Sequence, residues 1–143
     1  MDNLISLLDY AENQGIEVDW FSMKRASSLS IPLGEDRYGI AIDIQKIESQ
    51  SELVHKLAHE LGHCMTGSFY SVYTAVDCRQ RHENRADKWA IKHLIPVKDL
   101  DEAVANGCTE IWELAERFGV TEEFARKAVC YYVHGNLATE LYL

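Results

Sequence analysis

The spacing of hydrophobic residues changes twice along the chain. Residues 2–14 carry Leu and Ile at the three- and four-residue spacing of an amphipathic helix, and Gly15 follows as a suitable helix terminator. Residues 16–43 combine alternating and short apolar runs with a turn-like Gly-Glu-Asp segment, which predicts two or three short strands in a small antiparallel sheet. After Ser49 the spacing is helical again, so the pattern predicts an α+β protein with a mostly helical body.

Five helices are expected in the second helical part. Their predicted ranges are about 50–66, 79–94, 98–105, 109–118 and 121–133. No repeat, low-complexity tract or Pro/Gly/Ser-rich linker interrupts the 143 residues, so we expect one domain over residues 1–143. Its parts are the N-terminal helix and strands (1–49), two central helices (50–97) and the C-terminal helices (98–143).

The composition is that of a globular protein, with 47% hydrophobic and 26% charged residues. A net charge of −9 argues against nucleic acid or anionic lipid as a general partner. No apolar run is long enough to span a bilayer, and the first residues have neither the basic nor the apolar region of a signal peptide. These features predict a cytoplasmic protein without membrane contact, whose four cysteines form no C-x-x-C pair and are expected to be free thiols.

The most specific pattern lies in the first central helix, where His59, Glu60 and His63 form an H-E-x-x-H motif. Four residues turn an α-helix by about 400° and advance it by about 6 Å, so the two imidazoles project from one face and can meet on one metal ion. Glu60 lies one step around the helix, where it can reach a water molecule at the metal without binding the metal itself. The motif is therefore typical of a metallopeptidase with Glu60 as general base.

The apolar residues of the same helix support this placement. They occupy about 140° of its circumference and are Leu53, Val54, Leu57, Ala58, Leu61, Cys64 and Met65. His59 and His63 lie at about 240° and 280° from Leu53, on the opposite side. We expect one face in the core and the other, with the motif, in a cleft.

A catalytic zinc ion normally has three protein ligands and one open position, so a third ligand is required. We predict Glu83, on the helix expected at 79–94. The inward stripe of that helix consists of Glu83, Ala86, Asp87, Ala90 and Leu94. The alanines allow the two central helices to approach closely, and Asp87 is expected to accept the free ring N–H of His59 or His63.

Two histidines compete with Glu83 for the third position. His55 lies one turn before His59 on the same face, but three ligands along one straight helix would span about 12 Å, too far to converge on one ion. His82 is adjacent to Glu83 but points about 100° away. The alternative role of both histidines is that of a solvent-exposed or cleft-lining residue.

The segments HKLAHELGH and ENRADKWAIKHLIP resemble the ImmA/IrrE family of metallopeptidases, over about residues 26–100. The resemblance implies that His59, His63 and Glu83 bind zinc and that Glu60 is catalytic. The sequence departs from the family pattern at Asp87, where Asn is common, and at residues 93–96, which replace a more usual apolar run. Neither departure removes a ligand.

Family membership would also imply a biological role. The family is made up of cytosolic proteins of bacteria and their mobile elements that act on helix-turn-helix repressors to relieve repression. The resemblance therefore implies an endopeptidase whose protein substrate is a helix-turn-helix repressor. The alternative is an anti-repressor that binds its partner without cutting it and has a structural or vestigial metal site.

The sequence does not identify the residue that stabilises the oxyanion of the reaction. The candidates are Tyr70, Tyr73, Arg79, His82 and His134. The stretch 76–93 has a local charge of +2 in this acidic chain, which indicates either an acidic or polar substrate segment near the cleft or a solvated helix face.

Residues 113–129 resemble a helix-turn-helix, with Gly119 at the turn and Thr121 as N-cap of the second helix. Residues 98–143 contain 4 basic and 9 acidic side chains, and Glu122 and Glu123 open the second helix. This charge disfavours DNA binding, so the expected role of the region is packing or docking of a repressor.

Overall fold

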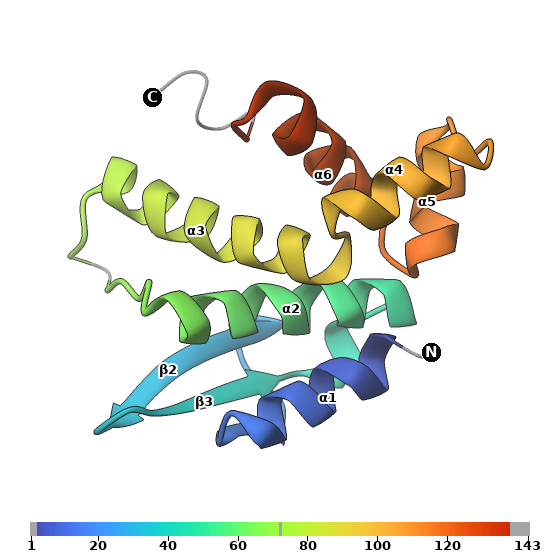
Figure 1. The fold of residues 1–143 in the computed structure, drawn as a ribbon. Helices are drawn as coiled ribbons and strands as arrows, with labels where there is room; N and C mark the ends of the chain where they lie inside the picture. Colours follow the sequence, from blue (N-terminus) through green and yellow to red (C-terminus); the bar gives the residue numbers. More distant parts are fainter. Residues whose placement is uncertain (1–2, 72, 138–143) are drawn as a thin grey trace.

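The computed structural model describes residues 3–71 and 73–137, and Figure 1 shows its elements in order. The helices are α1 (Asn3–Asn13), α2 (Gln50–Thr66), α3 (Val76–Leu94), α4 (Val97–Ala105), α5 (Ile111–Phe118), α6 (Glu122–His134) and a short 3-10 helix, η1 (Ile44–Lys46). The strands are β1 (Ile16–Trp20), β2 (Ser28–Gly34) and β3 (Arg37–Ile42). This confirms the predicted α+β class, although the first residue of the predicted range 2–14 and the last six of 98–143 lie outside the described residues.

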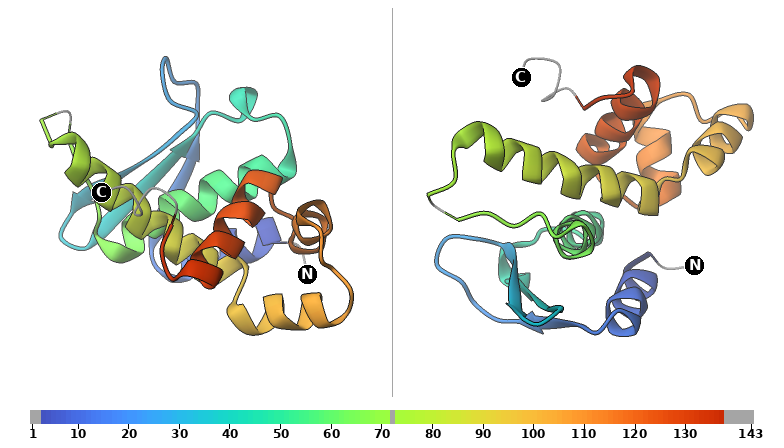
Figure 2. Two further views of the ribbon diagram at one scale, coloured as in Figure 1. Left: turned by 90° about the horizontal axis from the view of Figure 1, so that it is seen from above. Right: turned by 60° about the vertical axis from the view of Figure 1, so that its left-hand side comes forward.

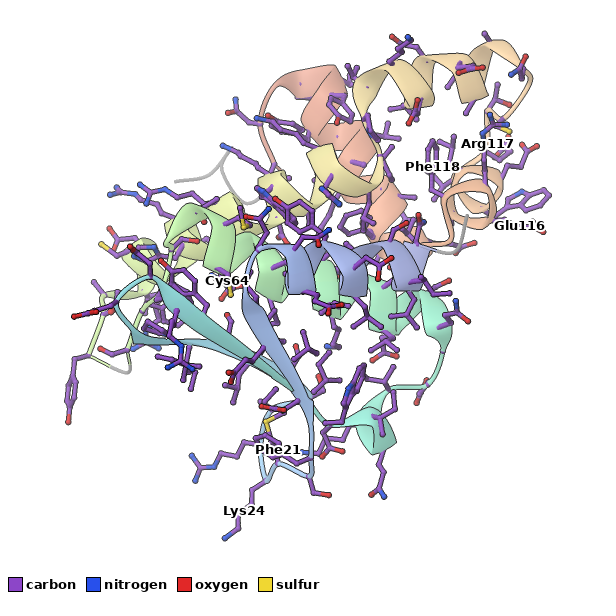
Figure 3. All side chains as sticks on the ribbon, turned by 60° about the horizontal axis from the view of Figure 1, so that its bottom comes forward. Phe21, Lys24, Cys64, Glu116, Arg117 and Phe118 are labelled. Carbon is purple, nitrogen blue, oxygen red and sulfur yellow. The ribbon has the colours of Figure 1, made fainter. Side chains whose placement is uncertain are left out.

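The sheet differs from the predicted antiparallel one. Its order is β1-β3-β2, with β2 antiparallel to β3 as expected but β1 parallel to β3. The reason lies in β3, whose residues Gly39 to Ile42 are all buried and therefore suit the central position. Residues 21–27 connect β1 to β2 past this central strand, and Figure 3 shows Phe21 and Lys24 at the outer end of the connection, away from α1 and α2.

Helix α2 begins and ends as local signals predict. The Ser49 side chain accepts a hydrogen bond from the backbone N–H of Glu52 at the N-terminus. Gly67 ends the helix in the left-handed conformation, with φ 65°. Helix α3 begins at Val76, earlier than the predicted residue 79, and no side chain caps it.

Helix α2 is the centre of the molecule. Figure 2 shows it between α3 on one side and the layer formed by α1 and the sheet on the other. Its apolar residues Val54, Leu57, Ala58 and Leu61 are 0–1% exposed, which confirms the predicted core face. The motif residues lie elsewhere on its surface, facing α3 and the edge strand β2.

Helices α5 and α6 pack on each other as the predicted helix–turn–helix-like pair, with Gly119 in the left-handed conformation and Thr121 as N-cap of α6. Phe124 of α6 is fully buried, and α6 also contacts α3. Helix α6 therefore packs on α3 and, through Phe124 and His55, on α2 as well as on α5. In the described part of the chain, no helix is long and apolar enough to cross a membrane.

Candidate metal centre

The close crossing of α2 and α3 depends on one glycine. A Cβ atom built on Gly62 would lie 2.4 Å from the carbonyl oxygen and 2.8 Å from the Cα of Ala86. The helices therefore approach to a distance that any larger side chain at Gly62 would prevent. Because Gly62 directly precedes His63 in the motif, this approach places the motif against α3.

The crossing brings together the three residues predicted to bind metal. Ligand atoms of His59, His63 and Glu83 all lie within 4.8 Å of one another. The Nε2 atoms of the two histidines are 3.2 Å apart, and the Glu83 carboxylate lies 2.5 Å from Nε2 of His59 and 3.3 Å from Nε2 of His63. Two imidazoles and a carboxylate converging in this way form a donor set that suits zinc.

Both histidines are oriented by a hydrogen bond at Nδ1. Nδ1 of His59 lies 2.7 Å from Oδ1 of Asp87, which is the contact predicted for Asp87. Nδ1 of His63 lies 2.5 Å from the backbone oxygen of Ser68. A carbonyl or carboxylate oxygen can only accept a hydrogen bond, so each ring carries a proton on Nδ1 and turns Nε2 toward the other members of the group.

The electrostatics of the group favour a cation at its centre. Burial acts to lower the pKa of His59, but hydrogen bonds to Asp87 and Glu83 outweigh it and raise the pKa to about 10. Burial acts to raise the pKa of Glu83, but hydrogen bonds from His59, His63 and Tyr70 hold it well below its ordinary value. Two carboxylates therefore stabilise a positive charge on His59 at the position where a metal ion would bind.

Glu60 is held by two serines of β2. The Oγ atoms of Ser28 and Ser30 each donate a hydrogen bond of 2.8 Å to one oxygen of the Glu60 carboxylate. The serines pair with Ile42 and Ile40 of β3, and directly paired residues of antiparallel strands share a face, so both hydroxyls point to the side of the sheet covered by α2. Sequence analysis missed the serines, although their two-residue spacing beside an apolar strand was a usable signal.

The site opens into two cavities that share Ser28 and Glu83. The first cavity, of about 260 Å³, is lined by β2 from Ser28 to Pro32, by Glu60 and His63, and by residues 68–70. The second cavity, of about 320 Å³, is lined by Ser28, His55, Lys56, His59, Gln80, Glu83, Asp87 and Lys127. His63 lines the first cavity, His59 lines the second and Glu83 lines both, so each member of the candidate metal-binding group borders an open space.

The competing histidines lie outside the ligand group, in the part of the chain described. His55 lines the second cavity, where its ring packs on Phe124 at a centroid distance of 4.8 Å. Burial, with Lys127 acting in the same direction, lowers the pKa of His55 to about 4, so the ring is neutral at pH 7. The ring of His82 stacks on the ring of Tyr70 at a centroid distance of 6.1 Å and is not part of the group formed by His59, His63 and Glu83 in the residues described.

Of the five candidates for the oxyanion donor, Tyr70 alone lines either of these two cavities. Its hydroxyl donates a 2.6 Å hydrogen bond to Oε1 of Glu83, which raises the pKa of Tyr70 to about 12 and keeps the group protonated. Tyr73 is 94% exposed, Arg79 donates to the backbone oxygen of Thr74, and His134 is exposed at the end of α6.

Comparison with known proteins gives one family for this chain. No curated protein matches the sequence. The sequence model of peptidase family M78, described as an IrrE N-terminal-like domain, matches residues 11–129 and so includes β1 to β3, both central helices and most of α6. Because the match covers far more than half of the chain and includes the H-E-x-x-H helix and Glu83, the protein belongs to the M78 peptidase family, with an IrrE N-terminal-like domain.

Proposed function

We propose that the protein is a zinc-dependent endopeptidase that acts in the cytoplasm and cleaves a helix-turn-helix repressor, thereby relieving repression. The observation that carries the peptidase assignment is the convergence of His59, His63 and Glu83 beside a carboxylate, Glu60, that two serines hold in place. Membership of a peptidase family supports the same assignment.

The donor set fits zinc. Two imidazole nitrogens and one carboxylate would leave a fourth coordination position open, as catalytic zinc requires. His59, His63 and Glu83 would hold the ion, with Asp87 and the backbone oxygen of Ser68 orienting the imidazoles. Zinc supplies a Lewis acid there, which makes a water molecule more acidic and polarises the carbonyl of the peptide bond.

Side chains of this protein transfer the proton of the attacking water and stabilise the negative charge that develops on the carbonyl oxygen. Glu60 accepts the proton of the attacking water and delivers it to the leaving amine. Ser28 and Ser30 orient the Glu60 carboxylate toward the first cavity, which all three residues line. Tyr70 lies in the same cavity with a protonated hydroxyl, and we propose that on substrate binding this hydroxyl exchanges its hydrogen bond to Glu83 for one to the oxyanion.

The shape of the site supports a polypeptide substrate. β2 is an edge strand of the sheet and lines the first cavity from Ser28 to Pro32. Edge strands have unpaired backbone groups that an extended peptide can use for pairing. A peptide lying along β2 would bring its backbone past Glu60 and the ligand group, as internal cleavage requires.

Removal of zinc tests the proposed function. Dialysis against a chelator is expected to reduce cleavage of helix-turn-helix repressor proteins by this protein to the background rate, and one equivalent of Zn²⁺ is expected to restore it. Cleavage is measured by mass spectrometry of the fragments and the metal by elemental analysis. Cleavage that persists in metal-free protein would contradict the proposal.

The serine contacts give a second prediction. We expect the double substitution Ser28→Ala, Ser30→Ala to lower kcat about 10- to 100-fold with little change in zinc affinity, because the general base loses its two orienting hydrogen bonds while the ligands stay in place. Steady-state kinetics and a zinc competition assay measure the two quantities. Ser27→Ala provides a control in the same segment, since Ser27 lines neither of the two cavities at the ligand group. A kcat equal to that of the unchanged protein would show that the serines do not position Glu60.

A further inference from the structure

Lys56 of α2 is a charged residue near the site, and none of the site contacts described above involves it. It is half-buried and lines the second cavity. Within residues 3–71 and 73–137 its ammonium group has neither a hydrogen bond nor an ion pair. A half-buried cation at the wall of a cavity, with no partner among the residues that the structure describes, is arranged to bind an anionic group of a ligand.

The other charged groups of this cavity are already engaged. Lys127 lies 3.5 Å from Asp87 and 3.8 Å from Glu123. Asp87 also contacts His59, and Glu83 belongs to the ligand group. Because His55 is neutral at pH 7, Lys56 provides the free positive charge of the cavity wall among the residues described.

The position of Lys56 on α2 gives its distance, along the helix, from the peptide bond that is cleaved beside Glu60. Lys56 precedes Glu60 by four residues on α2, which places it on the same helix face and about 6 Å farther along the axis. An extended peptide advances about 3.3 Å per residue. A substrate side chain that reaches Lys56 therefore lies about two residues from the bond that Glu60 serves.

We infer that Lys56 is a specificity-determining residue that binds the carboxylate of an Asp or Glu side chain about two residues from the cleaved bond. This inference rests on the proposed peptidase function and adds the chemistry of the substrate to it. Gln80 also lines the cavity, where its side-chain amide donates a hydrogen bond of 2.9 Å to Oδ1 of Asn84. The local positive charge of residues 76–93 acts in the same direction.

Cleavage of a mixture of randomised decapeptides, sequenced by mass spectrometry, tests this role. The zinc-loaded protein is expected to favour Asp or Glu over Asn or Gln about tenfold at one position near the cut, with a smaller preference at high salt. Lys56→Gln is expected to remove the preference, and Lys56→Glu to replace it with a preference for Lys or Arg. Lys98→Gln is the matched control, because Lys98 is exposed on α4 and lines neither cavity.

Failure of the inference and failure of the proposed function give different results. Cleavage without an acidic preference, or with the same preference after Lys56→Gln, would overturn the role of Lys56 and leave the peptidase assignment intact. If no peptide is cut, the peptidase assignment fails and binding decides the role of Lys56. A peptide of alternating Ala and Glu is then expected to bind the zinc-loaded protein about tenfold more tightly than its Ala-Gln counterpart in an NMR titration, with the difference absent in Lys56→Gln. Equal affinities for the two peptides would overturn the inference.

Discussion

The substitution Glu60→Gln is expected to lower kcat by about 1000-fold or more and to leave zinc affinity nearly unchanged. Glutamine has the shape of glutamate and can keep hydrogen bonds to Ser28 and Ser30, but it cannot accept and deliver the proton of the attacking water. Glu60 is not a member of the ligand group formed by His59, His63 and Glu83, so the metal should stay bound. Fragment formation from the repressor and zinc content per chain measure the two effects.

This substitution also separates cleavage from simple binding. Glu83→Gln serves as the comparison, since it removes a carboxylate ligand and is expected to lower zinc affinity together with activity. If Glu60→Gln still relieves repression while the repressor stays intact, the protein acts as a non-cleaving anti-repressor. If Glu60→Gln cleaves the repressor as fast as the unchanged protein, Glu60 is not the general base.

The substitution Gly62→Ala is expected to destabilise the fold by about 3 kcal/mol and to weaken zinc binding. Its Cβ would lie 2.4 Å from the backbone oxygen of Ala86, and backbone atoms cannot move aside as a flexible side chain can. The two helices would have to separate, which would move His63 away from Glu83. Urea denaturation of the metal-free protein measures the loss of stability, and competition with a chelator measures zinc affinity.

Gly39→Ala is the control for this effect. Gly39 is buried in β3, but the three atoms nearest to its Cβ would all belong to the side chain of Leu33, the first at 3.1 Å, and Leu33 is 42% exposed and can move. We expect a change in unfolding free energy of less than about 1 kcal/mol and no change in zinc affinity. If Gly62→Ala is as mild as Gly39→Ala, the close approach of α2 and α3 is not a requirement of the site.

The local sequence was sufficient to predict the helices and the helix face that His59 and His63 share. His59 and His63 are four residues apart on one helix, and helix geometry alone places them on one face. The apolar stripe of α2 and the caps at Ser49 and Gly67 are equally local, so the ends of α2 agree with the predicted range 50–66. Signals of this kind act over a few residues and can be read without knowledge of the rest of the chain.

The direction of the strands in the sheet could not be predicted from such local signals. Short strands were predicted from alternation, but β1 was expected to be antiparallel and is parallel to β3. The direction of a strand depends on which neighbour it pairs with, and the burial of Ile40 to Ile42 decides that β3 lies between the other two strands. Alternation along β1 contains no information about this choice.

The sequence by itself determined the H-E-x-x-H helix, the face on which His59 and His63 lie, and Glu83 as the candidate third ligand. Only the tertiary structure decided that Glu83 reaches the histidines, that Ser28 and Ser30 hold Glu60, and that Lys56 lines a cavity without a partner among the residues described. The physical reason is range: a helical repeat acts between residues three or four apart, whereas these contacts depend on how closely α2 packs against α3 and β2.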